Sequence, residues 1–224
     1  MKIILSLCMA LWFTLAHLGA GFGAETIKLP PPAKKGTVSV EEALQNRRSN
    51  RRFAARSLDL AQISQLLWAA DGINNPQGKR TAPAAKAAYA IDLYLVAGEG
   101  GVTNLAPGIY RYLVPEQALE PVAKGEFRKA VGQACNSQSW IAEAPVIFVI
   151  TGDYARCAAK NGDKPQMYTH MESGFVAQNL FLQAGALGLG AGIAGGFNPQ
   201  GLVQAVKLPQ NDVPLLVMPV GHKD

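Results

Sequence analysis

The feature that most restricts the fold of this chain is a long helix-forming stretch that is apolar on most of its sides. The spacing predicts a helix over about 169–187, with small residues at Ser173, Gly174, Ala177 and Ala184. A helix of this kind is buried, either at the centre of a core or against a second subunit. Its polar side chains need hydrogen-bonding partners; they are Glu172, Gln178, Asn179 and Gln183.

The rest of the sequence alternates strand and helix patterns, with no internal repeat and no obvious linker after residue 38. Hydrophobic residues make up 49% of the chain, which excludes a disordered protein. An apolar run over 145–151 predicts a strand covered on both faces. The patterns predict one α+β domain, a small mixed sheet with helices packed over it. Further strands are expected over 90–96, 108–114 and 214–220, and further helices over 39–48, 60–70, 127–134 and 199–205.

Residues 1–23 have the layout of a secretory signal, in which Lys2 precedes an apolar stretch of about 16 residues and small residues follow. The alternative is a retained membrane anchor, but the stretch is shorter than the roughly 20 residues of a spanning helix. We therefore expect signal removal, a periplasmic or secreted protein, and no stable membrane insertion afterwards. Residues 24–38 are rich in proline and charge, which predicts an extended leader before a domain over 39–224.

The charge balance is mildly basic, with 21 Lys and Arg residues against 16 Asp and Glu residues. This balance favours an anionic ligand and is too weak to indicate nucleic acid. No His, Cys or carboxylate residues have the spacing of metal ligands, so we predict no metal site. In the oxidising compartment that export implies, Cys135 and Cys157 either form a disulfide or are buried and unpaired, and we expect the second.

Four arginines stand close together in the sequence RRSNRRF, over 47–53, where the first predicted helix ends. Like charges at this spacing repel each other unless an anion lies among them. Guanidinium groups match the oxygens of a phosphate, and Ser49 adds a hydroxyl donor. A solvated basic face is the alternative. A nucleic-acid patch is a weaker third reading, because no aromatic residues are interleaved with the arginines.

Glycines crowd the segment 185–196, which follows the long helix. Such a backbone lets a flat ligand approach and bind main-chain N–H groups, and an ordinary turn is the alternative. The Gly-x-Gly-x-x-Gly spacing at 190–195 is not a dinucleotide fingerprint, because it follows a helix rather than a strand. The segments 78–85 and 138–145 also suit the edge of a flat ligand, although we expect Trp140 in the core.

Taken in order, these segments resemble the nitroreductase family of FMN-dependent oxidoreductases, and its SagB-type dehydrogenase branch most closely. The resemblance spans about 40–221 and is carried by RRSNRRF, GKRTAPAA, QSWIAEAPV, the long helix with its terminal glycines, and PLLVMPVG. It implies an α+β sandwich in which a mixed or antiparallel sheet is flanked by helices. It also implies an intertwined homodimer with FMN in a cleft between the subunits.

The resemblance also assigns cofactor contacts to residues of this chain. Arg47, Arg48, Ser49 and Arg51 match the positions that hold the FMN phosphate and ribityl chain, and Lys223 is the one candidate for a further cation after the last strand. Alanines stand at two loop positions where hydroxyl residues are common, so we expect the contacts there to be made by the backbone alone or to be absent. The remaining matches are Pro83, Ala84, Ala85 and Ala87 in a loop from the partner subunit, Gln138 near the flavin ring, and Gly195 and Gly196 beside its N5 atom.

The activity that the resemblance implies is hydride transfer carried by the flavin, without a catalytic side chain. We expect NAD(P)H-dependent reduction of nitroaromatic or quinone-like acceptors. Because NAD(P)H is scarce outside the inner membrane, two alternatives stay open: a SagB-like dehydrogenase that oxidises a peptide or small organic substrate, and a non-catalytic flavin-binding or electron-carrying protein. Hydrolase chemistry is disfavoured, because the sequence has no G-x-S-x-G element and no triad around His170.

Overall fold

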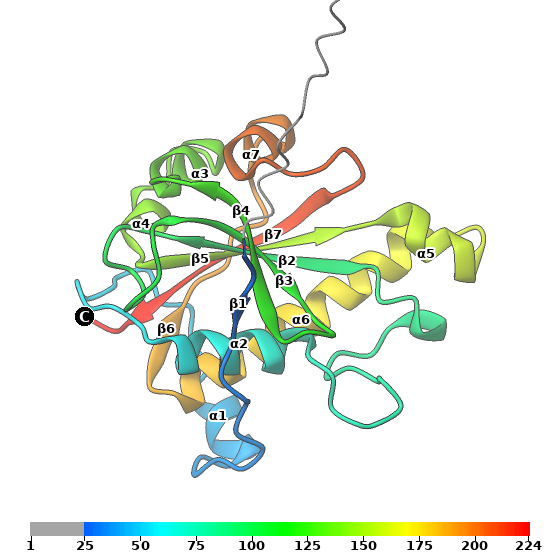
Figure 1. Ribbon diagram of the computed structural model, residues 1–224, viewed down its shortest axis with the longest axis horizontal. Helices are drawn as coiled ribbons and strands as arrows, with labels where there is room; N and C mark the ends of the chain where they lie inside the picture. Colours follow the sequence, from blue (N-terminus) through cyan, green and yellow to red (C-terminus); the bar gives the residue numbers. More distant parts are fainter. Residues whose placement is uncertain (1–24) are drawn as a thin grey trace, which may run out of the picture.

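The structure, a computed structural model, describes residues 25–224 and is built on one seven-stranded sheet (Figure 1). The strands follow the order β1-β4-β3-β2-β5-β7-β6, and each pairs antiparallel with its neighbours. The α+β prediction is confirmed. The sheet is larger than the residue pattern alone predicts, and of the two arrangements that the family resemblance implies, mixed or antiparallel, it is antiparallel. The strands are β1 (Ile27–Lys28), β2 (Ile91–Ala97), β3 (Gly108–Leu113), β4 (Ala118–Lys124), β5 (Val146–Gly152), β6 (Leu189–Ala191) and β7 (Val213–His222).

Helices cover both faces of the sheet. On one face pack α2 (Leu60–Asp71) and α6 (Pro165–Ala186), with α1 (Val40–Asn46) beyond them (Figure 1). The other face carries α3 (Arg128–Ala134), α4 (Ser139–Glu143) and α7 (Pro199–Val206). At one end of the sheet lie α5 (Tyr154–Asn161) and the short helix η1 (Ala85–Ala87).

The central strands divide their side chains between two cores, one under each helical layer. On β5, Phe148 and Ile150 pack with residues of α2 and α6, whereas Ile147 and Val149 pack with residues of α3, α4 and α7. All four are fully buried. Successive side chains of a strand point to opposite faces, so a strand between two helical layers needs apolar residues at every position. This explains the continuous apolar run in the sequence.

The long helix α6 lies in the first of these cores, as the sequence predicts. It begins earlier than expected, because Pro165 suits the first helical turn, where a backbone N–H has no helical partner. Of the four polar side chains singled out from the sequence, two have partners: Glu172 accepts a hydrogen bond from the Ala90 amide at 3.4 Å, and Gln183 accepts one from Gln65 at 3.0 Å. Gln65 also bonds to the backbone of Ala33 and so attaches the segment before α1 to the core.

Six elements were not predicted, namely β1, β4, β6, α4, α5 and η1. The sequence of β4 contains Pro121 and charged residues, and β1 is only two residues long, so neither shows strand periodicity. The segment 25–38 nevertheless contributes β1 and the buried Leu29, which its proline-rich composition does not indicate. The predicted signal over 1–23 lies outside the described residues. None of the helices within 25–224 combines the length and apolarity that crossing a bilayer requires.

Both cysteines of the described chain are buried and unpaired, which is the expected one of the two alternatives. Cys135 lies in the second core and Cys157 on α5. Burial raises the pKa of the Cys135 thiol to about 11, so this residue remains a protonated, unreactive thiol at neutral pH.

The last residue of α2, Asp71, carries a buried carboxyl group. Asp71 is 1% exposed and forms an ion pair with Arg80, whose guanidinium lies 4.5 Å from the ring centre of Tyr89. The pair therefore fixes the loop between α2 and η1. Burial raises the pKa of Asp71 from 3.8 to about 7, and the charge of Arg80 offsets only part of this effect.

This pKa shift predicts a pH dependence of stability. Because the pKa of Asp71 is higher in the folded state, its contribution is fully present below pH 3.8 and is lost as the pH rises to about 7. We expect Asp71→Asn to remove this contribution, so that its free energy of unfolding declines less than that of the wild type over this range. Urea denaturation at a series of pH values measures both slopes. The exposed Asp163→Asn is the control, and equal slopes for Asp71→Asn and wild type would contradict the prediction.

Candidate functional site

The arginine-rich segment lies beside the last strands of the sheet. The Asn50 amide donates to the carbonyl of Ala191 on β6 at 2.7 Å, and the Ala54 amide donates to the carbonyl of His222 on β7 at 3.0 Å. Phe53 forms an antiparallel bridge with Lys223. These backbone contacts bring residues from near the start and the end of the described chain to the same edge of the sheet.

A cavity of about 190 Å³ opens where these segments meet α6, and three cationic side chains line it: Arg47, Arg48 and Lys223. No acidic side chain is among its lining residues, and none of the three cations forms an ion pair within residues 25–224. The guanidinium of Arg47 lies 5.3 Å from the ring centre of Phe181, a cation–π contact that fixes its position. The site is therefore a positively charged hollow with ordered walls and no counter-ion of its own.

Two other predicted residues of the segment do not line this cavity. Ser49 forms a parallel bridge with Ala191 and is exposed. Arg51 is directed elsewhere, since its guanidinium lies 5.5 Å from the ring centre of Trp140. The structure therefore divides the arginine-rich segment between two neighbouring places, the cavity and the surface of Trp140.

Glycines of the following segment have two different environments. A Cβ atom at Gly192 would lie 2.5 Å from the ring of Trp140 and 2.7 Å from the Asn50 carbonyl, so this position needs glycine for packing. Gly195 and Gly196, by contrast, are exposed, with no neighbour closer than 3.4 Å to such an atom. Unlike Gly192, this pair leaves its backbone open to a ligand.

Gln138 does not face the open backbone of Gly195 and Gly196. Its side chain donates to the Cys135 carbonyl at 2.9 Å and accepts a hydrogen bond from the indole N–H of Trp140 at 3.0 Å. It therefore orients Trp140, which is half-buried between Arg51 and Gly192. We expected Trp140 in the core. Trp140 instead lies at the edge of the second core, partly buried and packed against it. Asn50 and Phe181 are further residues at the cavity that the sequence did not single out.

The predicted loop over 83–87 lies apart and lines no part of the cavity. Lys86 and Ala87 have φ angles of 47° and 51°, in the left-handed region that non-glycine residues rarely adopt. The end of α5 fixes this loop, because Asn161 donates to the Ala85 carbonyl at 3.1 Å and Lys160 donates to the Ala87 carbonyl at 2.7 Å. Pro83 is exposed, and Ala84 is partly buried.

Comparison with known proteins decides the family. The sequence profile of the nitroreductase family matches residues 44–222, which include six of the seven strands and every cavity-lining residue except Lys223. This chain belongs to the nitroreductase family. A protein of Methanocaldococcus jannaschii that is provisionally named a nitroreductase is 33% identical over 186 residues, covering 83% of this chain and 92% of the relative.

Two further proteins are similar to this chain, one in structure and one in sequence. A crystal structure from Ralstonia eutropha, also provisionally named a nitroreductase, superposes with a TM-score of 0.77 at 28% identity, covering 91% of this chain and 92% of the other. The NADPH-flavin oxidoreductase of Vibrio harveyi is 31% identical over 111 residues, which is 46% of each chain.

Within the part of this chain that the structure describes, no group of His, Cys, Asp and Glu residues is placed to hold a metal ion.

The close packing at Gly192 predicts a local effect of substitution. In Gly192→Val, the added side chain must displace Trp140 or the backbone at Asn50, because a Cβ atom would lie within 2.7 Å of both. We expect a loss of about 1–3 kcal/mol in the free energy of unfolding, measured by urea denaturation. Gly36→Ala, at a position with open space around it, is the control and should change stability little. A Gly192→Val protein as stable as the wild type would contradict this packing role.

Proposed function

We propose that this protein is an FMN-dependent oxidoreductase. The observation that carries the proposal is the cavity lined by Arg47, Arg48 and Lys223, three cations without a carboxylate partner. A phosphate monoester carries up to two negative charges and accepts hydrogen bonds from guanidinium and ammonium groups. A mononucleotide phosphate would therefore supply the counter-charge that these side chains lack.

The size of the cavity is consistent with part of a flavin mononucleotide. A volume of about 190 Å³ holds a phosphate and the adjoining chain atoms but not the whole cofactor. The ring system would extend outward over exposed backbone, which supports a role for Gly195 and Gly196. Their amides make no hydrogen bond to another described residue. Bound FMN would supply the hydride chemistry, and the chain's own residues would hold its phosphate and offer main-chain donors.

The proposed reaction is reduction of nitroaromatic or quinone-like acceptors with NAD(P)H as the electron donor. The name of the V. harveyi relative supports this donor, although the similarity covers less than half of each chain. We also propose that the protein is exported, on the strength of its signal-like residues 1–23. The SagB-like motifs support the alternative of a dehydrogenase that oxidises a peptide or small organic substrate, and a flavin-binding electron carrier is the third candidate.

Anaerobic mixing of the purified protein with NADPH separates the NAD(P)H-dependent reductase from the other two functions. A reductase should contain one FMN per chain, and NADPH should bleach the oxidised-flavin absorbance within seconds. Bleaching by another donor only, with none by NADPH, would favour the dehydrogenase or the carrier. A protein that contains no flavin and does not bind added FMN would contradict all three.

The cavity predicts which side chains retain the cofactor. Removing two charge-assisted hydrogen bonds in the double variant Arg47→Ala/Lys223→Ala should weaken FMN binding by roughly 10²- to 10⁴-fold. Fluorescence of released flavin after ultrafiltration measures this. Arg52→Ala, an exposed arginine of the same segment outside the cavity, is the matched control and should keep its FMN. Retention of FMN by a folded double variant would exclude this cavity as the phosphate site.

The surface of α6 supports a homodimer. Met167, Met171 and Phe175 follow one another at helical spacing and are 41%, 52% and 46% exposed. Val40 and Leu44 of α1 are also exposed, and α1 packs beside α6. An exposed apolar stripe such as that formed by Met167, Met171 and Phe175 indicates contact with another molecule. We propose that a second copy of the chain covers it, which agrees with the dimer that the family resemblance implies.

Charges on this stripe should separate the subunits. The double variant Met171→Asp/Phe175→Asp buries two carboxylates at the proposed contact and should be monomeric in light scattering after size exclusion, where the wild type is dimeric. Val122→Asp is the control, because Val122 is an exposed apolar residue on β4, outside α1 and α6. A monomeric wild type, or a double variant that stays dimeric, would contradict the proposed interface.

A further inference from the structure

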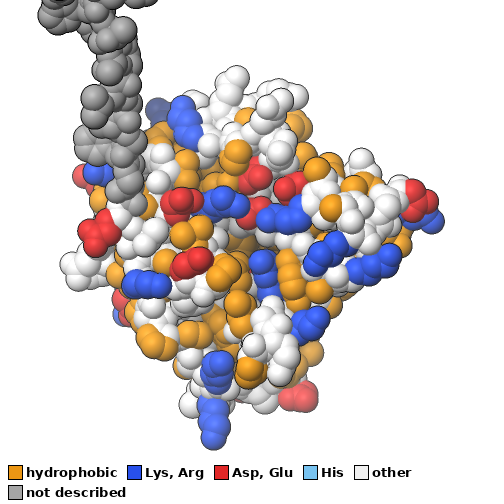
Figure 2. Space-filling view, turned by 45° about the vertical axis from the view of Figure 1, so that its right-hand side comes forward, with side chains coloured by type: hydrophobic (Ala, Val, Ile, Leu, Met, Phe, Trp, Pro, Cys, Tyr) orange, Lys and Arg blue, Asp and Glu red, His pale blue; other side chains and the backbone are white. Residues whose placement is uncertain are grey.

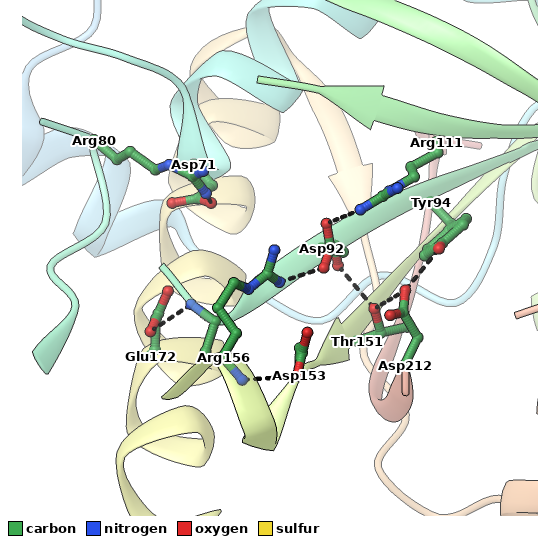
Figure 3. Close-up of polar contacts among 11 residues, drawn as sticks. Asp71, Arg80, Asp92, Tyr94, Arg111, Thr151, Asp153, Arg156, Glu172 and Asp212 are labelled. Carbon is green, nitrogen blue, oxygen red and sulfur yellow. Dashed lines mark hydrogen bonds and ion pairs between the residues drawn. The ribbon is translucent and has the colours of Figure 1, made fainter. Parts of the chain in front are cut away.

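A second polar cavity, of about 170 Å³, lies at the end of the sheet where β2 begins and β3 ends. Its charged lining consists of Asp71, Arg80, Asp92, Arg111 and Arg156, contributed by α2, the loop after it, β2, β3 and α5 (Figure 3). It shares no lining residue with the cavity of Arg47, Arg48 and Lys223. In the space-filling view, basic and acidic side chains gather beside the projection that carries α5 (Figure 2).

Two ion-pair groups form the walls. Asp92 accepts hydrogen bonds from Arg111, at 2.9 Å, and from Arg156, while Asp71 pairs with Arg80 (Figure 3). The arginines on β3 and α5 are 36% and 34% exposed, whereas Asp71 is 1% exposed. The cavity therefore runs from half-exposed guanidinium groups at the surface to a buried carboxyl in the interior.

The charges of the lining do not cancel. Three guanidinium groups face the two carboxylates of the lining, so one positive charge remains within the lining when both acids are ionised, and Glu172 beside the cavity balances it only when its own carboxyl is ionised. Burial raises the pKa of Asp71 to about 7, so at neutral pH part of the population holds this group protonated and the excess is larger. An arginine excess in a partly enclosed cavity attracts anions, because screening by solvent is weaker there.

The hydrogen-bonding capacity of this cluster is also incomplete. Among the described residues, four buried side-chain nitrogen or oxygen atoms have no partner: Asp71 Oδ1, Arg111 Nε, Arg156 Nε and Glu172 Oε1. Three of these belong to the lining of this cavity, and Glu172 stands next to it in Figure 3. Buried polar groups are normally satisfied, so a cluster that contains all of these exceptions calls for an explanation.

A purely structural role for these ion pairs would not explain the unpartnered buried atoms. Ion pairs that only tie β2, β3 and α5 together would have equal numbers of opposite charges and would satisfy their donors internally. Here two arginines share one carboxylate, and each keeps an unpartnered Nε–H group. Protonated Asp71 adds a hydroxyl donor in the interior. The two unpartnered Nε–H groups, together with the carboxyl of Asp71 when it is protonated, thus match a ligand that brings several acceptor oxygens.

We propose that this cavity binds a small oxyanion, a phosphate or carboxylate group, with one site per chain. Arg80, Arg111 and Arg156 contribute the positive charge, and Asp71 limits the affinity by competing for Arg80. The site is separate from the proposed FMN cavity, so the proposal stands or falls independently of the proposed function. The volume fits a group of a few heavy atoms and excludes a nucleotide.

The test is isothermal titration of the FMN-saturated protein with inorganic phosphate and, separately, with acetate. Saturable binding of either probe with a stoichiometry of one per chain supports the site, and the tighter probe identifies the chemical class. Arg111→Gln and Arg156→Gln should each weaken binding by about tenfold or more. Arg56→Gln removes an exposed arginine outside the cavity and should leave the affinity unchanged.

Asp71→Asn tests the site in the opposite direction. Asparagine resembles the protonated carboxyl, so this variant should remain folded, and loss of the competing charge should strengthen binding several-fold. A role in stability alone would not produce tighter binding. The proposal is overturned if neither probe saturates, or if Arg47→Ala/Lys223→Ala abolishes binding while the cavity variants keep it. Should Arg111→Gln or Arg156→Gln unfold, Asp71→Asn decides, and unchanged or weaker binding by that variant overturns the proposal.

Discussion

The candidate site depends on one set of backbone contacts, those that hold residues 49–54 against the ends of β6 and β7. The Asn50 amide bonds to Ala191, and the Ala54 amide bonds to His222. Without these contacts, Arg47 and Lys223 would have no reason to share a cavity, because almost the whole chain separates them in sequence. The glycine at position 192 permits the arrangement, since any side chain there would collide with the carbonyl of Asn50. The requirement for glycine at position 192 thus permits the packing that places three cationic side chains around one cavity.

The two-sided sheet sets the second constraint. Because β2 and β5 are buried on both faces, their charged residue Asp92 appears only near the end of the sheet, where α5 and β3 supply arginines. The same division into two cores places α6 partly in the interior and partly at the surface. Its polar residues bond inward to Ala90 and Gln65, while Met171 and Phe175 remain exposed. One helix therefore serves both the core and the surface proposed to meet a second subunit.

Much of the fold could be predicted from the sequence, because the central elements have strong hydrophobic periodicity. The helix over 60–70 and the strand over 145–151 differ from α2 and β5 by one residue at most at each end. Elements at the periphery escaped prediction for a physical reason. Pro121 and the charged residues of β4 obscure its strand character, and one of its two partners, β1, is distant in sequence.

The sequence predicted which residues could form the site, but not the directions in which their side chains point. The sequence identified the arginines, yet it could not show that Arg48 lines the cavity while Arg51 turns to Trp140. The separation of the cavity residues along the sequence also has a consequence for the order of events during folding. The cavity requires contacts between residues near both ends of the described chain, and such distant contacts form late because of the entropy of closing a long loop. Ligand capture at this cavity would therefore follow formation of the sheet and would lock a finished structure rather than nucleate it.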